Sequence, residues 1–525
     1  MNSLASTQRV RRVVIVLSAI TLIVFAGGCG SSGTPPVPNQ NGFSNSSLSG
    51  TYVFSSQGAD AINGFPLAVA GTLVSNGTGG ITGGTMDIVT PSFLPTPPSP
   101  AAQTITSGSY SVSSDGRGRA TLSSAYGSYT MAFVLTSTSH GLVSEFDGNG
   151  GGSGTIDIQT TAITSVGQLA GPYAFSAAGA DSGGGAFATE GAFVLTASGS
   201  SSAGVQDFND DANPITNLPL AAVATVGSGT GPGTLTLSTG SFVLTFDYYA
   251  TDATHLKLIE TDYNQFLAGD VFTQTGASAP TGILAFTMSG GVNFAISNGG
   301  FVTFNGATVT GSEDVNSNGT ILSQTFGGNA GAAGAVGSRV VVNLSGFNPA
   351  TQWVIYPSSG GFLLLETDTA NMTSGTAYTQ QSGAALAPSQ PYGFSLSAFN
   401  ITGPNDEDDI AQFTTTTTGF SGVVDINDNF GNGTTTQSLS WSGNYTLDSP
   451  ATGRGEATTT AGGSGFVSFN FYAVSNNQFL VLETDTNQIG TGMFQMQTAP
   501  SGAVAQSHVA MVHPAARPHA AWKRK

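Results

Sequence analysis

One pair of carboxylates recurs four times in this sequence, as a glutamate and an aspartate separated by a single residue. The pairs are Glu145/Asp147, Glu260/Asp262, Glu366/Asp368 and Glu483/Asp485. Residues two apart on a β-strand share a face, so each pair places two carboxylates side by side. Such pairs could act as the acid and base of a glycosidase or bind a cation. Because a catalytic site is elaborated once, whereas this pair recurs in every copy, we expect a structural motif at the rim of a sheet, with a cation site as the alternative.

A second pattern alternates aspartate and asparagine. It occurs as Asp207-Phe-Asn209, Asp314-Val-Asn316 and Asp425-Ile-Asn427, and Asp87 alone holds the slot in the first copy. Alternating oxygen donors resemble the start of a calcium-binding loop, which also needs a bidentate glutamate at its twelfth position. That position holds Leu218, Thr325 or Thr436, so an EF-hand is excluded. We interpret the pattern as an acidic hairpin tip with Asx turns and keep a weak Ca²⁺ site as the alternative; no other cofactor is indicated.

Arginine is scarce and recurs in turns rich in glycine. The turns are Gly116-Arg117-Gly118 and Gly453-Arg454-Gly455, Arg339 lies near the same slot of the third copy, and the second copy has Gly231-Pro232-Gly233. We interpret these segments as polar hairpin turns. The alternative is an ion pair between each arginine and the glutamate of its own repeat, which would fix register more than it adds stability.

Histidine is nearly absent from the repeats. His140 and His255 share one slot, five residues before the glutamate, and the other copies have Gly361 and Gln478 there. We interpret the slot as a turn that tolerates many residues. Two histidines do not support a Ser-His-Asp triad or a histidine metal site, and no phosphate-binding loop is present. The sequence therefore predicts no catalytic residues and a protein that is not an enzyme.

The recurrence of these motifs reflects four copies of one unit. Each copy opens on an aromatic strand such as Leu48-Ser-Gly-Thr-Tyr52-Val-Phe54 and closes on a Gln-Thr or Gln-Gln pair. The closing glutamines are Gln159, Gln274, Gln380 and Gln497. The repeats are expected at residues 48–160, 169–275, 281–382 and 391–498.

Each unit reads as a series of short strands separated by Gly, Asn, Asp and Ser. We expect all-β domains of about eight antiparallel strands each, in the form of an up-and-down barrel, with a two-sheet sandwich as the alternative. Gly-rich runs such as Gly148 to Gly154 are interpreted as loops. A unit of this length can bury its own core, so the four domains are expected to behave as independent beads.

The unit loosely resembles avidin-like and lipocalin-like barrels. The shared features are the Gly-x-Tyr-x-Phe opening strand, a second Gly-x-Tyr at Gly108-Ser-Tyr110 and Gly443-Asn-Tyr445, and the meander of short strands. Tandem units of this kind are also similar to the all-β repeats of bacterial surface lipoproteins. The resemblance implies a barrel fold and carries over no biotin-site or lipid-site residue.

The N-terminus reads as an export signal. Arg9, Arg11 and Arg12 precede an apolar stretch from Val13 to Phe25 that is too short to span a bilayer comfortably. The following Ala26-Gly27-Gly28-Cys29 resembles the lipobox of bacterial lipoproteins, with Ala26 where that family prefers leucine. The resemblance implies that Cys29, the only cysteine, carries the lipid. We expect a signal peptide at 1–28, a flexible tether at 29–47 and a disordered basic, histidine-containing tail at 499–525.

Composition sets the remaining limits. Charged residues make up only 8% of the 525 residues, and the net charge is −18. Without residues 1–28, 9 basic and 30 acidic residues remain, so the net charge becomes −21. Such a chain lacks the basic face that nucleic-acid binding needs and the Glu and Lys content of a coiled coil.

These observations predict an exported protein anchored by lipid to a bacterial membrane. Gly30 follows Cys29 where a retention aspartate would stand, which favours the outer membrane, at its periplasmic face or the cell surface. We expect modules that bind a repetitive ligand such as a polysaccharide, or a surface protein, through avidity. The alternatives are a purely structural stalk and, more distantly, a glycan-active hydrolase.

Overall fold

The computed structural model describes residues 42–500, except 62–63, 92–101, 126, 241, 263, 293, 333, 348–349, 402–404, 429–433, 449–451, 460–467 and 499. Within these residues the regular elements are β-strands and two short 3-10 helices, η1 (Asn45–Ser47) and η3 (Val166–Leu169). No helix in the described part of the chain is both long and apolar enough to cross a membrane. Cys29 and residues 501–525 lie outside the described residues, so the lipobox and the basic tail stay predictions.

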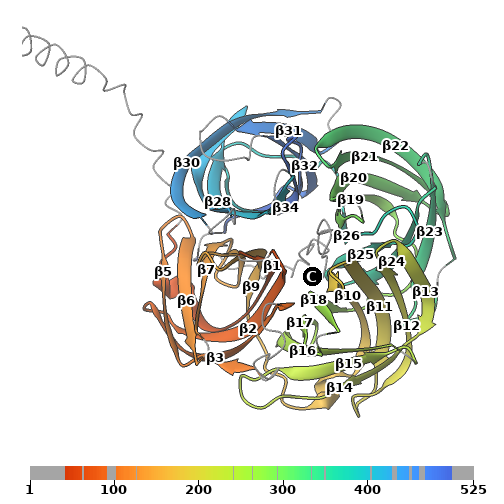
Figure 1. Cartoon of the computed structure of the whole chain (residues 1–525). Helices are drawn as coiled ribbons and strands as arrows, with labels where there is room; N and C mark the ends of the chain where they lie inside the picture. The colour runs from red at the N-terminus through yellow and green to blue at the C-terminus, as the bar shows by residue number, and fades with distance from the viewer. Residues whose placement is uncertain are drawn as a thin grey trace, which may run out of the picture. The chain divides into compact units, whose positions relative to one another are not determined.

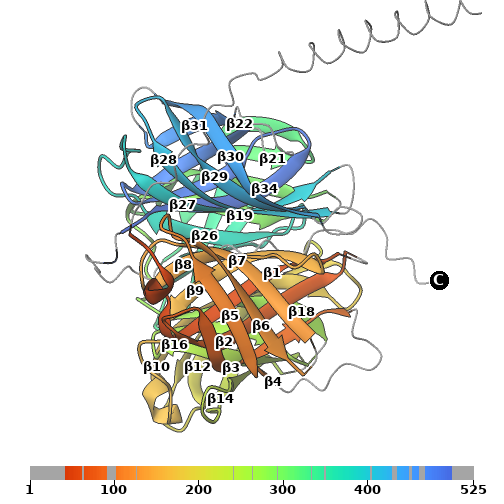
Figure 2. The same cartoon turned by 90° about the vertical axis from the view of Figure 1, so that its left-hand side faces the viewer.

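The strands form four antiparallel meanders, one for each repeat, and the last strand of each pairs with the first. This confirms the prediction of four tandem up-and-down barrels over that of sandwiches. Figures 1 and 2 show the strands of each repeat wrapped around their own interior, with β19–β26 in green and β27–β34 in blue.

The first barrel closes through pairing of β2 with β3, and β4 extends the sheet beyond β3. Its strands are β1 (Ser49–Asp60), β2 (Pro66–Asn76), β3 (Gly80–Val89), β4 (Gln103–Thr104), β5 (Ser107–Val112), β6 (Arg117–Ser124), β7 (Gly127–Leu135), β8 (His140–Glu145) and β9 (Gly150–Ile158).

The second barrel is nearly closed, with β13 and β14 at the two ends of its sheet and a single bridge between Ser200 and Val223. Its strands are β10 (Gly171–Asp181), β11 (Ala186–Leu195), β12 (Ser201–Asp210), β13 (Asn213–Pro219), β14 (Ala221–Ala224), β15 (Gly233–Ser238), β16 (Val243–Asp252), β17 (His255–Glu260) and β18 (Gln265–Thr273).

The third and fourth barrels are fully closed and have eight strands each. The third comprises β19 (Gly282–Gly290), β20 (Ile296–Asn305), β21 (Thr308–Ser317), β22 (Thr320–Ala330), β23 (Val340–Ser345), β24 (Gln352–Ser358), β25 (Gly361–Glu366) and β26 (Thr373–Thr379). The fourth comprises β27 (Pro391–Asn400), β28 (Asn405–Thr415), β29 (Gly419–Asp428), β30 (Thr434–Leu447), β31 (Arg454–Thr459), β32 (Ser468–Ser475), β33 (Gln478–Glu483) and β34 (Gln488–Met496).

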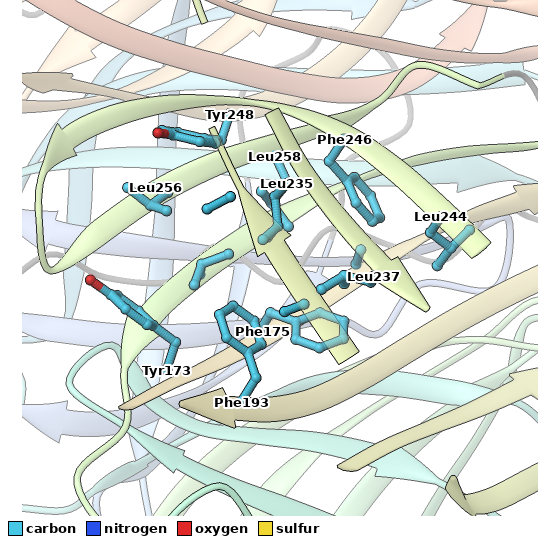
Figure 3. Close-up of a cluster of buried hydrophobic side chains, with 14 of the residues drawn as sticks. Tyr173, Phe175, Phe193, Leu235, Leu237, Leu244, Phe246, Tyr248, Leu256 and Leu258 are labelled. Atoms are coloured by element: carbon cyan, nitrogen blue, oxygen red, sulfur yellow. The ribbon is translucent and has the colours of Figure 1, made fainter. Parts of the chain in front are cut away.

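Each barrel encloses a hydrophobic core of its own. In the second barrel, side chains from β10, β11 and β15–β17 fill the space between the strands, among them Tyr173, Phe193, Leu235 and Phe246 (Figure 3). In the fourth, the core includes Trp441 and a group of phenylalanines. Because alternate residues of every strand point inward, large apolar residues at every second position are enough to fill a barrel of this size.

On the strands that face another barrel, such as β8, β9, β17 and β18, the residues facing outward are buried as well, because the barrels pack against one another. Apolar clusters join the first barrel to the second, the second to the third, and the first, third and fourth together. The barrels are therefore in contact and do not stand apart like beads on a string; independent folding of each barrel stays a prediction. A unit that buries its own core can also bury apolar residues on its outer surface against a neighbour. Here several strands carry apolar residues on both faces, one packed in the core and the other against another barrel.

Candidate functional site: the junctions between barrels

The glutamate of each repeated carboxylate pair is the last residue of a strand, in β8, β17, β25 and β33. The aspartate lies two residues later, where the chain turns toward the next strand. In two barrels it also accepts a backbone N–H from the preceding strand. Asp147 Oδ2 accepts from Thr130 N at 3.1 Å, and Asp262 Oδ2 accepts from Thr245 N at 2.8 Å.

All four aspartates make the same contact with their own turn, in which Oδ1 accepts the backbone N–H two residues ahead. The distances are 2.9 Å from Asp147 to Asn149, 3.1 Å from Asp262 to Asn264, 2.8 Å from Asp368 to Ala370 and 2.7 Å from Asp485 to Asn487. Asp485 Oδ1 also accepts from Gln488 N at 2.8 Å. The aspartates therefore order the turns, as Asx residues do elsewhere.

The paired glutamates are buried beneath these turns. Burial, and next the Asp262 carboxylate, raise the pKa of Glu260 to about 11. The pKa values of Glu145, Glu366 and Glu483 are also raised well above the ordinary range, by burial first and the neighbouring aspartate second. The protonated form of each glutamate is thus favoured at neutral pH. A buried neutral carboxyl without access to solvent suits structure better than hydrolysis.

The cation-site alternative for these pairs stays a prediction. In each pair the aspartate accepts backbone N–H groups of its own turn, and burial favours the protonated form of the glutamate, so ordering of the turn accounts for the contacts described. The pairs are Glu145 and Asp147, Glu260 and Asp262, Glu366 and Asp368, and Glu483 and Asp485.

The asparagine of each Asp-x-Asn motif binds the carboxylate-pair turn of the next barrel. Asn209 Nδ2 donates to the Glu366 carbonyl at 2.9 Å. Asn316 Nδ2 donates to the carbonyls of Glu483 and Gln488 at 3.0 and 2.8 Å. Asn427 Nδ2 donates to the carbonyls of Glu145 and Gly150, both at 2.7 Å. As the hairpin-tip interpretation predicted, the motif lies at the end of a strand. Its asparagine, however, hydrogen-bonds to the neighbouring barrel.

The aspartate of the same motif accepts hydrogen bonds from the next barrel as well. Tyr356 of the third barrel donates to Asp207, whose Oδ1 lies 2.9 Å from Arg339 Nη1. Tyr472 Oη and Arg454 Nε of the fourth barrel lie 2.6 and 2.7 Å from Asp314 Oδ2.

Burial alone would raise the pKa of Asp314, yet the Arg454, Ser323 and Tyr472 hydrogen bonds leave it below its ordinary value. The ionised form of Asp314 is therefore strongly held. We call the Asp and Asn of one barrel, with the Arg and Tyr of the next, the clasp.

The first barrel completes the series by contacting the fourth. Arg117 Nη1 lies 3.4 Å from Asp425 Oδ1, and Arg117 Nε also pairs with Asp115 at 2.9 Å. The sequence offered pairing with a glutamate of the same repeat only as the alternative to a hairpin turn. Arg117, Arg339 and Arg454 instead each pair with an aspartate of the preceding barrel. Arg454 additionally pairs with Asp448 and Glu456 of its own barrel.

The glutamine that closes each repeat donates to the following barrel in the same cyclic order. Gln159 Nε2 donates to the Ala250 carbonyl at 2.9 Å, and Gln274 Nε2 to that of Ser338 at 2.7 Å. Gln380 Nε2 donates to the Ala473 carbonyl at 3.1 Å, and Gln497 Nε2 returns to the first barrel at the Leu135 carbonyl, 2.8 Å away. The contacts thus run from barrel 1 to 2, 3, 4 and back to 1.

The junction between barrels 1 and 2 lacks most of the clasp. Tyr249 Oη donates to Asp87 Oδ2 at 2.6 Å, but Val89 replaces the asparagine and packs in the apolar cluster between the two barrels. Gly231-Pro232-Gly233 replaces the arginine turn. Burial raises the pKa of Asp87 to about 7 and that of neighbouring Asp247 to about 6.

A buried ionic chain takes the place of the clasp at this junction. His140 Nδ1 lies 2.6 Å from Asp157 Oδ1 in barrel 1, and His255 Nε2 lies 2.8 Å from Asp270 Oδ1 in barrel 2. Lys257 joins the two, with Nζ 3.0 Å from Asp157 Oδ2 and 4.0 Å from Asp270 Oδ1. The interpretation of the histidine slot as a tolerant turn is wrong, since both histidines begin strands, are buried and bind an aspartate.

The junction between barrels 4 and 1 accounts for the glycine run. Gly151 lies within β9 and is not part of a loop, contrary to the sequence interpretation. A Cβ there would lie 2.7 Å from Asp408 Oδ2 and 3.0 Å from Asp406 Oδ2 of the fourth barrel. Ser153 Oγ donates to Asp408 Oδ1 at 2.5 Å. Glycine is therefore needed where carboxylates of the fourth barrel approach the backbone of the first.

No group of three or more His, Cys, Asp or Glu residues in the described parts of the chain is arranged to hold a metal ion. The weak Ca²⁺ candidates instead contact the neighbouring barrel; they are Asp207, Asn209, Asp314, Asn316, Asp425 and Asn427. Tyr249, Tyr356 and Tyr472 were missed at the sequence level, although each lies in the strand before a carboxylate pair.

Comparison with known proteins adds no relative to this description. No protein-family model and no curated protein sequence matches this chain.

Proposed function

We propose that this chain is an exported, lipid-anchored and non-catalytic protein whose four barrels serve as one rigid structural unit at the surface of a bacterial membrane. The proposal is supported by the contacts that the repeated motifs make. The Asp-x-Asn motifs, the arginines and the closing glutamines bind one barrel to the next, and the carboxylate pairs order the turns that the asparagines bind. Because these motifs are engaged in contacts within the protein, they support a spacer or scaffold over a ligand-binding array.

The barrel interiors support the same proposal. Avidin-like and lipocalin-like proteins bind ligands in the barrel mouth or lumen, which requires space within the strands. Here the enclosed space holds aromatic and aliphatic side chains in all four barrels. Binding of a polysaccharide or surface protein therefore stays a prediction that rests on the repeat number alone.

Lipid attachment is tested by growing an expressing bacterium with labelled palmitate. We expect label in the wild-type chain and none in Cys29→Ser, with the wild type in the membrane fraction and the variant released. Palmitate in Cys29→Ser, or a soluble unlabelled wild type, would contradict the anchor. Two signals, acyl chains and N-terminal acylation together, are what stable anchoring requires.

The structural role is tested separately, with the released Cys29→Ser chain on a panel of immobilised polysaccharides. We expect no saturable binding to any of them. Saturable binding that a free oligosaccharide competes away would replace the scaffold with the binding function. A matched control is the same chain unfolded in denaturant, which reports non-specific adsorption.

A further inference from the structure

Lys257 is an unusual residue for its position. It is the only lysine before residue 523, and the residue is 1% exposed. The other three barrels have leucine at the corresponding place in the strand: Leu142, Leu363 and Leu480. Those leucines lie in the apolar clusters between barrels. A buried lysine in an apolar slot costs free energy unless its surroundings compensate, so the exchange of leucine for lysine calls for a specific role.

The surroundings of Lys257 are those of a reacting amine and acid. Nζ lies 3.0 Å from Asp157 Oδ2, across the junction between barrels 1 and 2, and both side chains are buried. His140 Nδ1 holds the other oxygen of Asp157 at 2.6 Å. Thr155 Oγ1 donates to Asp157 Oδ2 at 3.0 Å and also accepts a hydrogen bond from Nζ. The carboxyl group is thereby fixed with one oxygen against the amine.

A second carboxylate stands beside the pair. Asp270 pairs with Lys257 across β17 and β18, with Oδ1 4.0 Å from Nζ. Asp270 also contacts His255 Nε2 at 2.8 Å, and Phe272 stacks on the His255 ring with centroids 4.3 Å apart. This carboxylate is within reach of the amine proton without blocking Asp157.

We propose that Lys257 and Asp157 condense into an isopeptide bond that covalently joins barrels 1 and 2. The reaction forms a bond between Nζ and the Cγ of Asp157 and breaks the bond from Cγ to Oδ2. An ammonium and a carboxylate together hold the atoms of one amide and one water, so no oxidant, reductant or added proton is needed. One ammonium proton passes directly from Nζ to Asp157 Oδ2 across the 3.0 Å contact. Asp270 accepts a second proton from Nζ and returns it to the same oxygen, which then leaves as water.

Burial favours this condensation. Exclusion of bulk water removes the reactant that would hydrolyse the product, and the fixed contact supplies the proximity that an unassisted amine and acid lack. The bond would lie at the junction where the arginine and asparagine of the clasp are missing. A covalent tie there would take the place of the missing clasp contacts.

The mass of the full-length purified chain tests the proposal directly. After allowance for N-terminal processing and acylation, we expect the denatured chain to be lighter by one water molecule than the mass of its sequence. Trypsin should fail to cut after residue 257, since the amide removes the charge that the protease recognises. A single tryptic peptide spanning 120–339 should then replace the separate peptides 120–257 and 258–339. A full sequence mass together with complete cleavage after Lys257 would overturn the proposal.

Two variants distinguish the reaction from a structural ion pair. Lys257→Leu installs the residue of the other barrels, so it should fold and show its full sequence mass. Asp270→Asn keeps an acceptor for His255 but cannot carry the proton, so condensation after refolding should be about 100-fold slower. Condensation of Asp270→Asn at the wild-type rate would overturn the role of Asp270, and loss of water from Lys257→Leu would overturn that of Lys257.

Discussion

Two junctions, one between barrels 3 and 4 and the other between barrels 1 and 2, are built from equivalent strands of the repeat. They differ in how a buried aspartate is accommodated. In the first, Asp314 accepts hydrogen bonds from Tyr472, Arg454 and Asn470, the last at 2.9 Å. In the second, Asp87 keeps the tyrosine but faces Asp247 where the other junction has Asn470. The Asp314 carboxylate is stabilised by hydrogen-bond donors. The Asp87 carboxyl has a raised pKa, which favours its protonated form.

The comparison shows how four copies of one unit can diverge without losing the fold. The apolar core positions and the carboxylate-pair turns recur in every barrel. The outward-facing positions differ between barrels. At the junction between barrels 1 and 2, several residues that form the clasp elsewhere are replaced together. Val89 replaces the asparagine, Gly231-Pro232-Gly233 replaces the arginine turn, and Lys257 replaces a leucine.

The largest effect is expected from Asp314→Ala. The substitution leaves Arg454, Tyr472 and Asn470 without their common acceptor, and loss of one partner from a buried pair costs about 3–5 kcal/mol. The free energy of unfolding from denaturant titration measures the loss. Asp448→Ala, which removes a partly exposed partner of the same arginine, is the matched control and should cost less than about 1 kcal/mol. Equal effects of the two variants would contradict a buried clasp.

Asn316→Ala should have the next largest effect. It removes the amide that donates to the carbonyls of Glu483, Asp485 and Gln488, and unsatisfied buried carbonyls cost about 2 kcal/mol together. Val89→Asn places the motif asparagine in the junction that lacks it. The variant should lower the free energy of unfolding by about 1–3 kcal/mol, because it buries an amide within an apolar cluster. Stabilisation by Val89→Asn would show that the two junctions are interchangeable. Denaturant titration of both variants provides the measurement.

Asp247→Asn should make the 1–2 junction resemble the 3–4 junction. Burial raises the pKa of Asp87 to about 7, so the folded chain holds a proton that the unfolded chain releases near pH 4. Stability from this pair is therefore present at low pH and falls as pH rises toward 7. An asparagine amide would instead donate to ionised Asp87, so the variant should be more stable than wild type by about 1–2 kcal/mol above pH 7. Unfolding free energy measured against pH checks this, and an unchanged pH profile would contradict it.

Gln497→Ala tests the return contact from barrel 4 to barrel 1. The variant loses the hydrogen bonds to the carbonyls of Asp115 and Leu135, which contribute about 1 kcal/mol. Hydrogen exchange should increase at backbone amides of both barrels next to this contact. Exchange confined to the fourth barrel would indicate that the cycle does not close there.

Calcium should have the smallest effect of all. The asparagine amides and the aspartate carboxylates of the Asp-x-Asn motifs are already engaged by the neighbouring barrel, so millimolar Ca²⁺ should leave the thermal unfolding midpoint unchanged. A rise in the midpoint that Asp425→Asn abolishes would instead establish a cation site at the 4–1 junction.

The sequence predicted the features that depend on a single repeat. The four-fold spacing of Glu145, Glu260, Glu366 and Glu483 located the units, and alternation with turn residues predicted the barrels. The contacts between barrels could not be predicted, because periodicity shows which residues face outward but not what they face. Gly151 is an example. Its glycine-rich surroundings predict a loop, and only the structure shows Asp406 and Asp408 of another repeat close to it.

The four barrels are expected to depend on one another for stability through their junctions. The most direct measurement compares thermal unfolding of the excised fourth barrel, residues 391–498, with unfolding of the full chain. Loss of its clasps to the third and first barrels removes several kcal/mol, so the excised barrel should unfold more than about 10 °C below the full chain, or fail to fold. An excised barrel that unfolds cooperatively at the same temperature as the full chain would contradict the account and restore the independent beads.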